Sequence, residues 1–275
     1  MAMTLEKLCE LIELQDEIKE QVFIEMKQMD FAPLQEHILA LTKPGAIKAF
    51  TALSEIIGYE FPGIKMLCCY LRAALITYEK YKELGVDDEI YVETMKFFTR
   101  FIGECLERRG KLGFDRAAWS QRHLNLSIVR IGTLEYEFKD AEDKKVVSVH
   151  IPSGADLSFV SLKASFVAAR KFIKEKIPEY AEAPFVCGTW LLFDRLKEFL
   201  RPESKILQFQ SCFNIEKQYE TGEASLSFIF QKEDCSDYTA LPEKTSLQRK
   251  LKEFLLSGGV ITSGYGVVKE GIDQE

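Results

Sequence analysis

The sequence predicts an α+β protein of two domains, an N-terminal all-α helical bundle and a C-terminal mixed β-sheet flanked by helices. Apolar residues recur at three- and four-residue spacing from Thr4 to about Arg109, which is the period of helices. Beyond this part, segments with strand-like alternation follow one another between helices. At 275 residues the chain is long for a single core, so we expect two domains, 1–115 and 116–275.

Breaks divide the N-terminal part into successive helices. Thr4 is a capping residue for a first helix that we expect to continue to Met29. The helix that follows Phe61-Pro62-Gly63 is apolar on nearly every side, which predicts a central position in the bundle. A last helix is expected from about Ile90 to Leu106.

The C-terminal part predicts the order ββαβαββαβ. The expected strands are 128–138, 145–151, 185–191, 206–215, 224–230 and 260–268, and the expected helices are 159–177, 194–200 and 245–256. A polar loop at Lys139–Lys144 joins the first two strands, and the fourth and fifth are expected to turn around Thr221-Gly222. This alternation predicts a mixed sheet covered by helices.

Composition excludes several classes of protein. The chain is 47% hydrophobic and 29% charged, as a folded soluble protein requires, and it has no apolar run of about 18 residues that would favour a membrane anchor. Its seven cysteines include no C-x-x-C pair, which predicts buried thiols in a reducing cytoplasm and no metal site. A net charge of −7 disfavours nucleic acid as a partner.

The stretch from Val146 to Pro178 reads as a strand, a tight turn and a long amphipathic helix. Gly154 can adopt a positive φ, and Ser153 with Asp156 three residues later fits a capping box that would open the helix. Free backbone N–H groups at such a turn can bind a phosphate group. The turn is therefore either a pyrophosphate cradle or an ordinary, well-capped connection.

Three side chains on the first two strands are candidates for proton transfer. Glu135 and Glu137 lie two residues apart and so share one face of a strand, opposite Leu134, Tyr136 and Phe138. The alternative is that they mark the solvent face of a half-buried strand. His150, at the end of the next strand, titrates in the range useful for a general base, although a lone histidine can also be simply packed.

The C-terminal order of elements resembles the acyl-CoA N-acyltransferase (GNAT) fold. The segments RHLNLSIVRIGTLEYEF, VHIPSGADLS, FVCGTWLL and LPEKTSLQRKLKEFL are also similar to those of a bacterial acyltransferase family in which a helical N-terminal domain precedes a GNAT-like C-terminal domain. The resemblance covers essentially the whole chain. It implies acyl-CoA as co-substrate and no metal.

The resemblance also implies where coenzyme A would bind. In GNAT enzymes a Gln/Arg-x-x-Gly-x-Gly/Ala loop before the long helix holds the pyrophosphate through backbone N–H groups. Placing Ala155 at the last small position puts Ser153 at the first glycine and His150 at the start of the motif. Moving the frame by one residue puts Gly154 at the first glycine, with Ile151 and Asp156 at the other two positions.

Two functions are compatible with these residues and with the resemblance. The first is an acyl-CoA-dependent N-acyltransferase that transfers an acyl group, such as acetyl, to a small-molecule or peptide amine. Glu135, Glu137 or His150 would be the base, and the cofactor-binding residues would be Ile151, Ser153, Gly154, Ala155 and Asp156. The second is a non-catalytic ligand-binding or interaction protein that retains a GNAT-like fold. The sequence sets neither the acceptor nor the oligomeric state.

Overall fold

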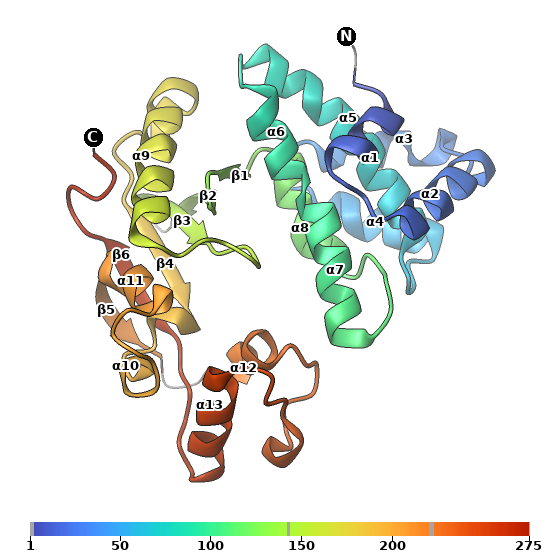
Figure 1. Ribbon diagram of the computed structural model, residues 1–275. Helices are drawn as coiled ribbons and strands as arrows, with labels where there is room; N and C mark the ends of the chain where they lie inside the picture. The colour runs from blue at the N-terminus through green and yellow to red at the C-terminus, as the bar shows by residue number, and fades with distance from the viewer. Residues whose placement is uncertain (1–2, 142–143, 220–222, 275) are drawn as a thin grey trace. The chain divides into compact units, whose positions relative to one another are not determined.

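The computed structural model describes residues 3–141, 144–219 and 223–274 (Figure 1). The chain forms two compact units, one up to Arg130 and one from Ile131 onward. The first is helical and the second contains the sheet, which confirms the predicted two-domain α+β class. The division lies later than the expected boundary at 115/116, because the helix Ala117–Leu124 packs with the first unit.

The helical unit is organised around α5. Its elements are α1 (Leu5–Leu11), α2 (Asp16–Gln28), the 3-10 helix η1 (Ala32–Leu34), α3 (Gln35–Leu41), α4 (Ile47–Ile57), α5 (Ile64–Glu83), α6 (Asp88–Met95), α7 (Phe97–Arg109) and α8 (Ala117–Leu124). Helix α5 is buried along most of its length and contacts α1, α2, α3, α4, α6 and α8, which confirms its predicted central position.

Two helices expected to be continuous are each divided. Glu13 has a φ of +56° in the break between α1 and α2, a left-handed conformation that cannot continue a helix. Lys96 separates α6 from α7. The apolar periodicity on either side of each break is helical, so the pattern predicted the helices and missed the breaks.

The second unit contains a mixed six-stranded sheet with the order β1-β2-β3-β4-β6-β5. Its strands, as the structure describes them, are β1 (Ile128–Ile131), β2 (Leu134–Ala141), β3 (Lys144–His150), β4 (Phe185–Thr189), β5 (Phe213–Gln218) and β6 (Gly264–Val268). Strands β3 and β4 are parallel, whereas the pairs β2–β3, β4–β6 and β5–β6 are antiparallel. The expected first strand is split into β1 and β2 by a turn in which Gly132 has a φ of +62°.

Five helices accompany the sheet in the described chain: α9 (Phe159–Lys176), α10 (Leu196–Phe199), α11 (Lys205–Ser211), α12 (Glu223–Phe230) and α13 (Ser246–Leu256). Helix α9 lies along one side of the strands (Figure 1) and buries Leu162, Phe166 and Ile173. The ring of Phe166 packs 5.8 Å from that of Phe185 on β4. The amphipathic face predicted for this helix is confirmed.

Two expected strands are wrong. Residues 206–215 form α11 and the start of β5, because Ser204 caps a helix by accepting a hydrogen bond from the backbone N–H of Ile206. Residues 224–230 lie in α12, since short apolar runs do not distinguish a strand from a buried helix. The expected turn at Thr221-Gly222 and part of the Lys139–Lys144 loop lie outside the described residues.

A second apolar core lies beside the sheet and joins α10, α12 and α13. Its fully buried members include Leu196, Phe230 and Leu251. Helix α13 opens with a capping box between Thr245 and Gln248, which explains its accurately predicted start. In Figure 1 α12 and α13 form a lobe to one side of the strands.

All seven cysteines are free thiols, and six of them are buried, as the sequence predicted. Within the described residues, no helix has both the length and the apolar character needed to cross a membrane.

Candidate functional site

His150 and Glu137 form a close pair at the end of β3. In the antiparallel register of β2 and β3, His150 lies opposite Glu135, and Glu137 lies opposite Ser148. The Nε2 atom of His150 reaches diagonally to Oε2 of Glu137, at 2.7 Å. The structure thus brings all three predicted catalytic residues onto one patch of the β2–β3 ribbon.

Lys139, on the same strand as Glu137, adds a third charged group to this pair. Its Nζ lies 2.6 Å from Oε2 of Glu137, the oxygen that also faces His150. Sequence reasoning missed this lysine, although its position two residues after Glu137 places both on one face of β2. Strand spacing was the signal that could have found it.

The neighbouring His150 and Lys139 keep the carboxyl of Glu137 ionised. Burial alone would raise the pKa of its carboxyl, but hydrogen bonds from His150 and Lys139 outweigh it and lower the pKa to about 2. Glu137 is therefore an ionised acceptor at neutral pH. In neutral His150 the proton must then be on Nε2, which donates to Glu137, and the basic lone pair is on Nδ1.

The glutamates do not mark a solvent face. Glu135 is 2% exposed and Glu137 is 5% exposed, while Leu134 and Tyr136 on the other face are also buried. Both faces of this part of β2 are covered, so the interpretation of a half-buried strand is wrong. His150 keeps partial contact with solvent, because its side chain is 27% exposed.

Strands β3 and β4 separate next to this patch. They pair over Val147–Phe185 and Ser148–Val186, while β3 runs on to His150 and β4 to Thr189. Beyond the paired residues, the Cys187 thiol donates to the backbone oxygen of Val149 at 3.2 Å. The space where a Cβ on Gly188 would lie has no atom within 4 Å, so the face of β4 at this residue is uncovered.

Cys187 itself is not an activated nucleophile. It is 1% exposed, and burial raises the pKa of its thiol to about 12. A thiol in this state remains protonated at neutral pH.

The loop after β3 differs in detail from the expected cap. Helix α9 begins at Phe159, and its N-cap is Ser158, whose hydroxyl accepts from the N–H of Ser161. The capping box expected from Ser153 and Asp156 is wrong, because Ser153–Asp156 precede the helix by several residues. Three backbone positions, Ser153, Gly154 and Ala155, therefore form a separate turn.

That turn is open to solvent. Gly154 has a φ of +78°, and nothing lies within 4 Å of the position of an added Cβ. Ser153 and Gly154 are exposed, Ile151 and Ala155 are half-buried, and the N–H of Ala155 bonds to the oxygen of Pro152 at 3.1 Å. The exposed backbone of Ser153 and Gly154 gives a pyrophosphate room to approach.

The side chain of Asp156 points towards the start of α9. Its carboxylate accepts from the N–H of Ser158 at 3.1 Å, from the hydroxyl of Ser161 at 2.7 Å and from Nζ of Lys205 at 2.7 Å. The hydrogen bond from Lys205 is the largest cause that lowers the pKa of Asp156 below its ordinary value. The negative charge that would oppose a phosphate is thus paired with a lysine.

Lys205 and Gln208 come from α11 and were not identified from the sequence. Gln208 accepts the N–H of Phe159 at 2.9 Å through Oε1, so two residues one helical turn apart clamp the start of α9. Nearly fifty residues separate them from the loop, and no local pattern reveals such a contact. In the described part of the chain, no group of three His, Cys, Asp or Glu side chains could hold a metal ion.

A divergent pair of parallel strands, a small-residue turn and a long helix define the class of GNAT-like folds. The chain belongs to the family that combines an N-acyltransferase N-terminal domain, matched over residues 3–126, with a GNAT-like C-terminal domain, matched over residues 128–268. The family resemblance noted in the sequence is confirmed. No curated protein sequence matches the chain.

Solved acyltransferase structures share this fold. One in complex with decanoyl-CoA and teicoplanin is 20% identical, with a TM-score of 0.79 over 96% of this chain and 87% of the other. A mutant acyltransferase in complex with octanoyl-CoA has a TM-score of 0.80 at the same identity and coverage. A third, with CoA and 10C-teicoplanin, is 19% identical, with a TM-score of 0.70 over 97% of this chain and 99% of the other.

Proposed function

We propose that the protein is an acyl-CoA-dependent N-acyltransferase that transfers an acyl group to a small-molecule or peptide amine. The observation that carries this proposal is the His150–Glu137 pair beside the divergence of β3 and β4. Membership of the family supports the same reaction. Structures of the fold that contain decanoyl-CoA, octanoyl-CoA and CoA support acyl-CoA as the donor.

His150 is the proposed general base. A neutral amine attacks the thioester carbonyl, and Nδ1 of His150 accepts the proton that the amine nitrogen loses. The new C–N bond forms and the C–S bond breaks, and the departing sulfur takes the proton from the imidazolium of His150, so that coenzyme A leaves as its thiol and His150 is neutral again. Backbone N–H groups along the diverging strands can polarise the carbonyl.

Glu137 acts as a positioning residue in this proposal. As an ionised acceptor it fixes the ring of His150 in the tautomer with the lone pair on Nδ1 and stabilises the imidazolium that forms. Glu135 lies opposite His150 in the register and remains a candidate for contact with the amine.

The proposed donor site is the turn that follows His150. The exposed backbone of Ser153 and Gly154 would hold the pyrophosphate. The N–H of Ala155 itself donates to the oxygen of Pro152, so Ala155 would contribute only a small side chain that leaves that backbone uncovered. Ile151 would contact the adjoining part of the coenzyme. Asp156 serves indirectly, because its carboxylate accepts from the N–H of Ser158 and holds Lys205 next to the turn. The buried, free thiols favour a cytoplasmic location.

The first experiment measures ligand-dependent stability. Unfolding would be followed with CoA, decanoyl-CoA and adenosine 3′,5′-bisphosphate, and saturation to about 100 times Kd should add roughly 2.7 kcal/mol. An amine screen with decanoyl-CoA then tests transfer. His150→Gln should keep the stabilisation by decanoyl-CoA and lose transfer.

Two results would contradict the proposal. An absence of stabilisation by every coenzyme at millimolar concentration would favour the non-catalytic binding protein. Full transfer by His150→Gln would refute the assignment of His150 as the base, without affecting the proposal that the protein binds the donor.

A further inference from the structure

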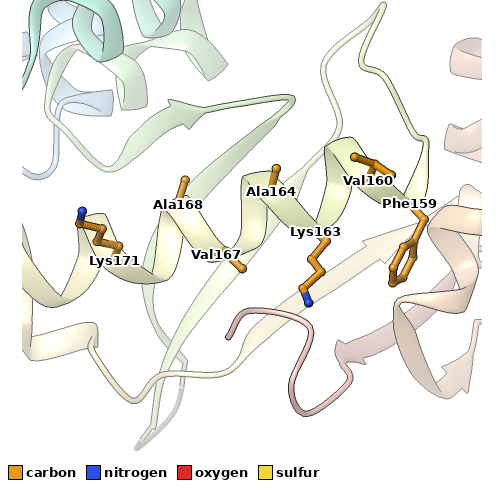
Figure 2. Close-up of a pocket in the computed structure, with 7 residues that line it drawn as sticks. All are labelled: Phe159, Val160, Lys163, Ala164, Val167, Ala168 and Lys171. Atoms are coloured by element: carbon orange, nitrogen blue, oxygen red, sulfur yellow. The ribbon is translucent and has the colours of Figure 1, made fainter. Parts of the chain in front are cut away.

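The exposed face of α9 carries a shallow apolar hollow. Figure 2 shows the side chains along it, which project from successive turns of the helix. The hollow has a volume of about 530 Å³ and is lined by Phe159, Val160, Lys163, Ala164, Val167, Ala168 and Lys171. Val160 is 78% exposed and Phe159 is 40% exposed, a high exposure for large apolar side chains.

The charged groups that line this hollow are both positive. Lys163 and Lys171 lie eight residues, or about two turns, apart, with Val167 between them in the same helical row. Ala164 and Ala168 project to the opposite side of the helix from Lys163 and Val167 (Figure 2) and form one edge of the hollow. One turn further, Lys174 and Glu175 are both exposed, so the positive charge is concentrated at Lys163 and Lys171. A complementary surface would have apolar side chains between carboxylates.

The hollow begins next to the proposed donor site. Phe159 follows Asp156 by three residues, and the lining extends about 18 Å along α9 to Lys171. A partner seated there would have its surface close to the turn of Ser153–Ala155, where the phosphate of a donor is proposed to bind.

We propose that this hollow docks an acidic amphipathic helix of a carrier protein that presents an acyl group on phosphopantetheine. The inference rests on the proposed acyl-transfer function. An acyl carrier and acyl-CoA share the same phosphopantetheine thioester, so the proposed donor site suits both. Small side chains at Ala164 and Ala168 allow a partner helix to approach closely, and its carboxylates pair with Lys163 and Lys171.

Other occupants fit this surface less well. A second copy docked through the same face in a two-fold arrangement would bring the lysines of one α9 towards those of the other. A membrane-binding helix inserts a continuous apolar face among lipids, whereas Lys163 and Lys171 interrupt the apolar side chains along this hollow. A recess flanked by lysines favours a partner that projects its own apolar side chains.

The experiment measures binding and does not depend on catalysis. A bacterial acyl carrier protein, converted to its decanoyl form and labelled with a fluorophore, would be titrated with the full chain at low and at high salt. The test variant is Lys163→Glu/Lys171→Glu. The control is Lys197→Glu/Lys244→Glu, which makes the same charge change at two exposed lysines of the same unit.

We expect the carrier to bind the parent protein and the control similarly, and to bind the test variant at least about 10-fold more weakly. Binding should also weaken with salt. Stabilisation by decanoyl-CoA should be unchanged in the test variant, which shows that it remains folded. If decanoyl-CoA stabilised none of the proteins, the parent included, the proposed donor would be refuted. The carrier titration would still test docking, because it measures binding directly.

Three results would overturn the docking proposal. One is no carrier binding by a parent protein that decanoyl-CoA stabilises, and another is equal binding by the test variant. The third is that phosphatidylglycerol vesicles, but not the carrier, bind in a manner that depends on Lys163 and Lys171, which would identify a membrane surface.

Discussion

The Nε2 atom of His150 lies 2.7 Å from Oε2 of Glu137, across two antiparallel strands. Because Glu137 is ionised, this contact determines which nitrogen of the neutral ring has the lone pair. A slip of β3 by one residue would move His150 to the face opposite Glu137. The pairing of β2 with β3 is therefore part of the proposed chemistry.

The first prediction concerns the tautomer of His150. With only three histidines in the chain, ring ¹⁵N resonances can be assigned by single substitutions. Neutral His150 should be protonated on Nε2, and Glu137→Gln should lower kcat about 10- to 100-fold with a smaller effect on KM for the donor. Observation of the Nδ1–H tautomer in the parent protein would contradict the proposed role of Glu137.

The second prediction is a pH dependence of stability. The pKa of Glu137 is lowered from 4.5 to about 2, so its stabilisation is complete above about pH 4.5 and is lost as the pH falls towards 2. The contribution is at most about 3 kcal/mol. Urea unfolding between pH 6 and 2.5 should lose less stability in Glu137→Gln than in the parent. Identical profiles would mean that the carboxyl is not held ionised.

The third prediction concerns the ion pair of Asp156 and Lys205. Lys205→Met should weaken CoA binding about 3- to 10-fold, because it exposes a carboxylate beside the proposed pyrophosphate site. Adding Asp156→Asn should restore most of the affinity. Calorimetric titration of both variants tests this. Equal weakening in the single and double variants would show that the carboxylate charge does not affect donor binding.

The fourth prediction concerns the anchor of the C-terminal segment on α9. The guanidinium of Arg170 donates to Asp273 at 2.7 Å and to the backbone oxygens of Ala181 and Ala183, and it stacks over the ring of Phe185. Arg170→Lys keeps the charge and loses the planar fork, which should cost about 2 kcal/mol of unfolding free energy. Unchanged denaturant midpoints would contradict this role.

Sequence patterns predicted elements whose signal is local. The periodicity of Leu162, Phe166 and Ile173 fixed α9, and the alternation around Tyr136 fixed β2. Alternation could not reveal that the face of Glu135 is covered, because the chain that covers a strand is not encoded in that strand. For the same reason the clamp from Lys205 and Gln208 was beyond prediction. The short run 224–230 was misassigned because its length suits either a strand or a helix.

The position of β6 has a consequence for synthesis of the chain. β6 lies between β4 and β5 in the sheet, yet it is the last of these strands to emerge from the ribosome. Until residues 264–268 have been made, β4 and β5 each expose an edge that has no native neighbour. The nascent protein must therefore hold two open strand edges through the synthesis of the whole α12–α13 lobe, a period in which aggregation and chaperone capture compete with folding.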